Sequence, residues 1–408
     1  MFLRDLDALK EKPFRWQFAA QSASVLGDQI APIALAFAVL DQTGSATDLG
    51  LVLLARQVPL ALVVLAAGVW ADRLPRNRMM FAADWTRFGT QALLAVLVMA
   101  GHATLWHFLA LQAVNGCATA LFQPAATGLT PLTVSRDRLQ QANALMSLTI
   151  SVAVVVGPIV GGIIVATVGP GWGLAVDSAT FAASAVCLMQ VRIPKRVLAA
   201  KPQNMLADLA AGWREIGSRR WLLLGIIDLS LFQMLVYSTY FVLGPLIAKQ
   251  HLGGSASWGL IVTMWGVGAA LGGVMALRFT PRRPIVMALF PLAAVTPSMI
   301  LLGLAPSLAA VAVTAIPAGA AMVFSSVYWD TTLQREVPEG SLSRVSAYDW
   351  AGSMALRPAG YAAVGPIAAA ISARWTLIGA ALILLTAQLA TLFSSSVRAV
   401  RGVPDRTT

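Results

Sequence analysis

The chain has 408 residues, of which 58% are hydrophobic and 12% are charged. An ordinary soluble domain carries about 25% charged residues, so this composition excludes a water-facing globular protein and predicts a membrane protein. The net charge of +11 is distributed between apolar runs and forms no single basic face, which excludes a nucleic-acid-binding protein.

Twelve apolar runs, each bounded by charged or turn residues, follow one another along the chain. About 20 apolar residues cross a hydrocarbon core of about 30 Å, so each run is long enough for one transmembrane helix. We therefore expect an all-α membrane protein with twelve transmembrane helices. The predicted spans are 15–40, 49–71, 79–100, 105–127, 142–168, 171–191, 221–247, 256–277, 283–303, 308–330, 344–372 and 373–396.

The basic residues alternate between the two sides of these spans. Of the 29 lysines and arginines, 24 lie on the side that holds both termini, whereas the opposite loops hold only Lys249 and Arg374. Because cytoplasmic loops are enriched in lysine and arginine, we expect both termini to be cytoplasmic.

An internal repeat divides the chain into two similar halves. Arg15-Trp16 is echoed by Arg220-Trp221 after 205 residues, and residues 68–73 align with residues 273–278 at the same offset. We predict six-helix bundles over residues 1–191 and 221–408, related by pseudo-two-fold symmetry, joined by a cytoplasmic linker over 192–220. Apolar residues at helical spacing favour an amphipathic interfacial helix at 205–217, with an unstructured linker as the alternative.

The segment Gly68-Val69-Trp70-Ala71-Asp72-Arg73-Leu74-Pro75-Arg76-Asn77-Arg78 resembles the loop signature between helices two and three of the major facilitator superfamily. The resemblance implies alternating access between two bundles and a cytoplasmic latch that closes in the outward-facing state. The alternative is a set of plain positive-inside charges. The latch residues are expected to be Gly68, Asp72, Arg73, Arg76, Arg78, Asp84 and Arg87.

Gly157, Pro158, Gly161 and Gly162 in span five resemble the antiporter motif of the same superfamily, which accompanies exporters that exchange substrate for protons. Small residues let two membrane helices approach closely, and proline bends the helix axis.

Further stretches are similar to the drug:proton antiporter branch that includes enterobactin and macrolide exporters. They are Leu26-Gly27-Asp28-Gln29, Ala55-Arg56-Gln57-Val58-Pro59, Ala142-Asn143-Ala144, Asp177-Ser178-Ala179-Thr180-Phe181 and Gln334-Arg335-Glu336-Val337-Pro338.

Charged residues within spans are costly, by at least about 2.5 to 3.5 kcal/mol each, so each needs a partner or a function. Asp28 and Arg56 both reach a depth of roughly 20 Å, counting about 1.5 Å per residue. We expect them to form an ion pair that couples transport to protons. A purely structural pair and a direct contact of Asp28 with a cationic substrate are the alternatives. Asp84, Asp177 and Asp349 are expected to be structural.

Arg357 lies equally deep and has no evident partner on its own helix. It is expected either to face the central cavity or to pair with Asp228 or Asp349. The superfamily fold lines its cavity with spans one, four, seven and ten. By depth, the candidate cavity residues are Asp28, Gln29, Asn115, Gln233, Tyr237, Tyr240, Phe324 and Arg357.

The sequence therefore predicts a monomeric multi-pass exporter in a bacterial cytoplasmic membrane, which moves an amphipathic drug-like, macrolide-like or siderophore-like molecule by proton antiport. The three histidines and two cysteines form no metal-ligand or catalytic cluster, so we expect no metal, no cofactor and no enzyme activity. A facilitator or importer, and a receptor or scaffold that has lost transport, are the alternatives.

Overall fold

The computed structural model describes residues 4–192, 216–217, 219–279 and 281–400, and the regular secondary structure of these residues is helical, with no strand. The chain folds into two compact units. Residues 1–201 with 253–263 form the first unit, and residues 202–252 with 264–408 form the second. The amphipathic helix predicted at 205–217 lies almost entirely outside the described residues.

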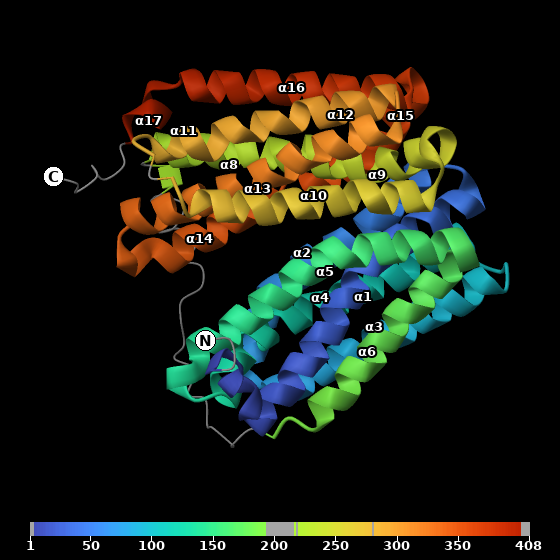
Figure 1. The fold of residues 1–408 in the computed structure, drawn as a ribbon, viewed down its shortest axis with the longest axis vertical. Coiled ribbons are helices and arrows are strands. Elements are labelled where there is room, and N and C mark those ends of the chain that lie inside the picture. The colour runs from blue at the N-terminus through green and yellow to red at the C-terminus, as the bar shows by residue number, and fades with distance from the viewer. Residues whose placement is uncertain (1–3, 193–215, 218, 280, 401–408) are drawn as a thin grey trace. The chain divides into compact units, whose positions relative to one another are not determined.

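The first unit is built on six long helices (Figure 1). Within it α1 packs against α5 and α6, α3 packs against α4 and α6, and α2 packs against α4. Helix α3 therefore contacts helices on two of its sides, and its charged residues Asp84 and Arg87 are buried inside the unit. The helices are α1 (Lys12–Thr43), α2 (Ala46–Arg73), α3 (Arg76–Met99), α4 (Leu105–Thr133), α5 (Leu139–Val168) and α6 (Pro170–Met189), with short 3-10 turns at Arg4–Lys10 and Arg136–Arg138.

The helices of the second unit are interrupted more often. Each of three predicted spans consists of consecutive helical pieces. The seventh is α8 (Arg220–Phe232), a π-helical turn (Gln233–Tyr237) and α9 (Ser238–Ile247), followed by a second π turn (Ala248–Leu252). The ninth is α11 (Pro284–Leu289), a 3-10 turn (Phe290–Ala294) and α12 (Val295–Leu304), and the eleventh is α14 (Glu339–Met354) and α15 (Arg357–Ile371). The remaining helices are α13 (Leu308–Glu336), α16 (Ala373–Phe393), α17 (Ser395–Ala399) and α10 (Ser255–Ala276), of which residues 255–263 belong to the first unit.

Eleven helical segments of the described residues are long and apolar enough to cross a membrane. Helix α3 is not among them, because Arg76, Arg78, Asp84 and Arg87 concentrate charge in its first half. Asp84 and Arg87 are buried, so their charges do not face lipid. The prediction of an all-α membrane protein is confirmed.

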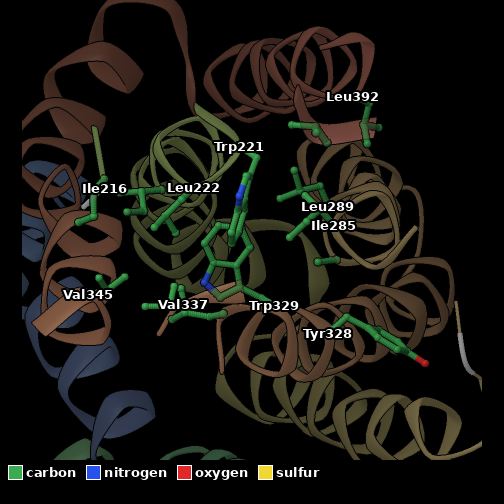
Figure 2. Close-up of a cluster of buried hydrophobic side chains, with 14 of the residues drawn as sticks. Ile216, Trp221, Leu222, Ile285, Leu289, Tyr328, Trp329, Val337, Val345 and Leu392 are labelled. Carbon is green, nitrogen blue, oxygen red and sulfur yellow. The ribbon is translucent and has the colours of Figure 1, made fainter. Parts of the chain in front are cut away.

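Close aromatic packing holds α8 against α13 in the second unit. Figure 2 shows Trp221 and Trp329 at the centre of a buried apolar cluster, with Leu222 and Leu289 beside them. The two indole rings meet edge to face with centroids 6.0 Å apart. Gly225 lies directly against the Trp329 ring, where a Cβ atom would collide with it. Because apolar lipid gives little driving force for helix association, such shape-matched packing must hold these helices together.

Candidate functional site

Asp28 and Arg87 form a buried to half-buried ion pair inside the first unit. Nη2 of Arg87 on α3 donates to both carboxylate oxygens of Asp28 on α1, at 2.6 Å each. Arg56 on α2 lies farther away, with its Nη2 3.8 Å from Asp28 Oδ1. The structure therefore brings the predicted Asp28–Arg56 pair together, but the tighter partner of Asp28 is an arginine that the sequence analysis assigned to the latch.

Arg87 is buried among several groups that suit a cation. Its Nη1 donates to Asp84 Oδ1 at 3.1 Å and to Ser24 Oγ at 3.3 Å, and its guanidinium carbon lies 3.8 Å from the ring centroid of Phe181. Asp84 also accepts a hydrogen bond from Ser184 of α6. Removing one partner of a buried ion pair is expensive, so these side chains act as one unit. We call Asp28, Arg56, Asp84 and Arg87 the charge network.

The exposure of the network changes from one member to the next. The side chain of Arg87 is 1% exposed and that of Asp84 is 0% exposed, whereas Asp28 is 28% exposed and Arg56 is 26% exposed. Of the two carboxylates of the network, Asp28 is therefore the one that the packing leaves partly exposed.

A second row of polar side chains continues from the network between α3, α4 and α6. Gln91 donates to Asp177 Oδ2 at 2.6 Å and accepts from Gln112 at 3.2 Å. Asn115 donates to Thr90 Oγ1 at 3.5 Å and is 2% exposed. The structure thus places the predicted cavity residue Asn115 between helices of the first unit.

The predicted antiporter motif packs against the residues that follow Asp28. A Cβ atom at Gly157 would collide with Gln29, and one at Gly161 would lie 3.1 Å from the carbonyl oxygen of Ile30. All four motif residues, Gly157, Pro158, Gly161 and Gly162, are buried. The small residues of α5 therefore allow α1 to approach closely at the depth of its charged residue.

The predicted latch residues separate into two groups. Arg76 donates from Nη1 to the carbonyl oxygen of Gly128 on α4, whereas Arg78 is exposed. Asp84 and Arg87 lie in the charge network. Helix α2 is described to Arg73, but the surroundings of Gly68 and the side chains of Asp72 and Arg73 are not described.

The second unit contains a cavity of about 180 Å³ between α8, α11, α13 and α14. The predicted cavity residues Gln233 and Tyr237 both line it, and both belong to the π-helical turn. Tyr240 and Phe324 are not brought to it. Tyr240 is fully buried, with its hydroxyl 3.2 Å from Ser298 Oγ, and Phe324 packs in the apolar cluster.

Arg357 lies against the aromatic side chains next to this cavity. Its guanidinium carbon is 4.4 Å from the ring centroid of Tyr237, and its Nε donates to the hydroxyl of Tyr361 at 3.1 Å. The expectation that Arg357 lacks a partner on its own helix is therefore wrong, because Tyr361 follows it by one turn of α15. Among the described residues, no ion pair joins Arg357 to Asp228 or Asp349.

Sequence reasoning also missed two polar contacts that organise the units. Trp329 donates from Nε1 to Asp349 Oδ2 at 3.0 Å, which links α13 to α14. Glu11 accepts from Ser135 Oγ at 2.7 Å and from Arg138 Nη1 at 3.3 Å, which fastens the start of α1 to the connection between α4 and α5. A tryptophan and a glutamate that lie far from their partners in sequence give no pattern by which these contacts could be found.

The chain matches the family described as "Transmembrane secretion effector" over residues 5–402. Similar proteins include the macrolide efflux protein A of Streptococcus pyogenes, 25% identical over 58% of this chain and 59% of that protein. The chain thus spans about three fifths of that relative's length. The enterobactin exporter of Escherichia coli is 27% identical over 95% of each chain.

Solved structures with the same fold are membrane transporters. They include a bacterial homologue of the iron transporter ferroportin, with a TM-score of 0.69 and 17% identity over 94% of this chain and 99% of the other. Another is a bacterial homologue of the human lysosomal transporter Spinster, with a TM-score of 0.71 and 15% identity over 97% and 98% of the two chains. At these identities the likeness shows the twelve-helix transporter fold alone.

Proposed function

Since the chain belongs to the transmembrane secretion effector family of the major facilitator superfamily, an efflux transporter family, we propose that it exports an amphipathic small molecule by proton antiport. The observation that carries proton coupling is the pairing of the partly exposed Asp28 with the buried Arg87. The similarity to macrolide and enterobactin exporters supports an amphipathic cargo.

Protonation of Asp28 neutralises the group that accepts both 2.6 Å hydrogen bonds from Arg87. The guanidinium then keeps Asp84 as its carboxylate partner and Phe181 as its aromatic neighbour. Because α1 and α3 are joined at this point by the Asp28 pair, a proton on Asp28 loosens α1 from α3, and its departure joins them again. In alternating access, that change couples proton binding to the movement of the two halves.

The glycines of α5 give α1 a surface along which it can shift. Gly157 and Gly161 carry no side chain where Gln29 and Ile30 lie against them. A helix that packs through backbone and small residues can slide or rock without displacing long side chains. The antiporter motif therefore supports a movement of α1 that begins at Asp28.

The test uses everted membrane vesicles that contain the wild-type chain or the variants Asp28→Asn and Glu336→Gln. Glu336 pairs with Arg335 at the helix end and serves as the matched carboxylate control. A radiolabelled macrolide and enterobactin are the probes. We expect Asp28→Asn to abolish uptake driven by a pH gradient, and Glu336→Gln to retain it.

Unchanged gradient-driven uptake in Asp28→Asn would remove Asp28 from the mechanism. Uptake that is insensitive to an uncoupler in the wild type would indicate a facilitator instead of an antiporter. A chain that moves neither protons nor any probe would be a receptor or scaffold.

We also propose a bacterial cytoplasmic membrane as the location, with both termini on the cytoplasmic side and one chain as the transporting unit. The support is the distribution of basic residues, 24 of 29 on the side of the termini. Green fluorescent protein fused to the C-terminus should fluoresce, whereas an alkaline phosphatase fusion at the same point should stay inactive. The reverse pattern would overturn the orientation.

A further inference from the structure

The cavity of the second unit is too small for a whole drug-sized ligand. Its volume is about 180 Å³. Pockets that enclose drug-sized ligands measure about 300 to 1,000 Å³. The cavity therefore fits one end of an amphipathic molecule, or a molecule with a single aromatic ring.

Four residues that line this cavity each carry a polar atom that is buried without a hydrogen-bond partner in the part of the chain that the structure describes. These atoms are Oδ1 of Asp349, Oε1 of Gln233 and the hydroxyl oxygens of Ser325 and Ser353. They come from the π-helical turn, from α13 and from α14. Buried polar atoms in folded proteins are normally hydrogen-bonded, so four such atoms around one cavity indicate a place that accepts a polar ligand.

The chemistry of these atoms indicates that the ligand donates hydrogen bonds. A carboxylate oxygen and an amide oxygen only accept, and a serine hydroxyl can accept as well as donate. Trp329 Nε1 donates to the other carboxylate oxygen of Asp349 at 3.0 Å, which fixes the carboxylate and leaves Oδ1 without a hydrogen-bond partner. No lysine or arginine of the described ranges forms an ion pair with Asp349.

The aromatic walls of the cavity also suit a positively charged ligand. Phe232, Tyr237, Trp329 and Trp350 present four aromatic side chains to it. Aromatic faces attract cations, and tryptophan does so most strongly. The nearby Arg357 is already engaged by the Tyr237 ring and the Tyr361 hydroxyl.

The backbone of the seventh span also indicates a functional site at this cavity. Gln233 and Tyr237 begin and end a π-helical turn that interrupts the seventh span. Such turns cost regular hydrogen bonding and are frequently found at functional sites. Here the turn contributes two side chains to one cavity.

We propose that this cavity is a subsite for the protonated amino group of an amphipathic amine, with Asp349 as its counter-ion and the aromatic side chains around its apolar part. The inference rests on the proposed function only in taking the cargo as amphipathic. It assigns a ligand role to an aspartate that the sequence analysis expected to be structural.

The test measures equilibrium binding to the purified full chain in phosphatidylcholine nanodiscs, with no gradient, by saturation-transfer NMR. The probes are phenylethylamine, phenylethanol and phenylacetate, which share one ring and differ in charge. We expect the amine to bind about ten-fold more tightly than the alcohol, and phenylacetate to show no binding. Equal binding of amine and alcohol would overturn the proposal and indicate a neutral hydroxyl site.

Two variants place the effect at Asp349. Asp349→Asn should remove the preference for the amine, whereas Asp228→Asn, which changes a buried carboxylate that does not line the cavity, should keep it. Ser325→Val fills part of the cavity without changing its charge and should weaken the binding of the amine and of the alcohol equally. An unchanged amine preference in Asp349→Asn refutes the proposal, and so does unchanged amine binding in Ser325→Val.

The same measurement separates this proposal from proton coupling. Asp28→Asn should bind phenylethylamine as the wild type does, because Asp28 is not among the residues that line the cavity. If Asp28→Asn loses gradient-driven uptake but the wild type binds no amine, the proposal of proton antiport stands and the proposed amine subsite is refuted. If the wild type binds the amine and Asp28→Asn keeps its uptake, the subsite stands and the role of Asp28 in proton coupling is refuted.

Discussion

The charge network gives a quantitative expectation for Arg87. Replacing Arg87 with glutamine leaves Asp84, whose side chain is 0% exposed, without its ion-pair partner. Breaking a buried ion pair by removing one partner costs about 3 to 5 kcal/mol. Asp28→Asn costs less, because Asp84 still pairs with Arg87. A double-mutant cycle of Asp28→Asn with Arg87→Gln should therefore give a coupling energy of about 1.5 to 3 kcal/mol.

Arg56 supplies the matched control for that cycle. Its Nη2 lies 3.8 Å from Asp28 Oδ1, and both side chains are about a quarter exposed. Partly exposed pairs at such distances contribute about 1 kcal/mol or less. The cycle of Asp28→Asn with Arg56→Gln should therefore give a coupling energy below about 1 kcal/mol.

Both cycles can be measured as the free energy of unfolding in mixed micelles of dodecyl maltoside and SDS, followed by circular dichroism. Arg87→Lys keeps the charge but loses the planar guanidinium that contacts Asp28, Asp84 and Phe181 together, so it should recover only part of the stability. A coupling energy for Arg56 that equals or exceeds that for Arg87 would refute the assignment of Arg87 as the main partner.

Three further substitutions test other contacts. Gly157→Ala forces α1 and α5 apart, so we expect lower thermal stability and slower uptake. The control is Gly89→Ala, whose added Cβ atom meets no other atom within 4 Å and which should keep the wild-type stability and uptake. Equal effects of the two substitutions would contradict the packing role of Gly157. Arg76→Ala removes a hydrogen bond to α4 and should slow initial uptake more than Arg78→Ala, whose side chain is exposed. Tyr361→Phe removes one hydrogen bond while keeping the ring, and should lower the unfolding free energy by about 1 kcal/mol or less.

Several features of the charge network could be predicted from the sequence, because they depend on depth along a helix. Asp28 and Arg56 were expected at the same level, and the structure brings them within 3.8 Å. The closer partner, Arg87, could not be found in this way. It is 59 positions from Asp28 in the chain, and its neighbours depend on which face of α3 turns toward α1.

The cavity of the second unit likewise has some features that the sequence predicts and others that it does not. Gln233 and Tyr237 were expected at cavity depth from their place in the seventh span, and both line the cavity. Asp349 was expected to be structural from its place near the inner end of span eleven, and hydropathy gives no sign that its Oδ1 is left without a partner. Tyr240, three residues after Tyr237, is buried instead, with its hydroxyl oxygen 3.2 Å from Ser298 Oγ.

The sequence by itself predicted an all-α membrane protein with twelve transmembrane helices, whose buried charges must have partners or functions. These conclusions follow from composition and run length, which are local properties of the chain. Only the tertiary structure decided which charges meet and where unpartnered polar atoms converge on a cavity. The rotation of each helix about its axis and the choice of its neighbours arise from packing among many residues, and no single segment encodes them.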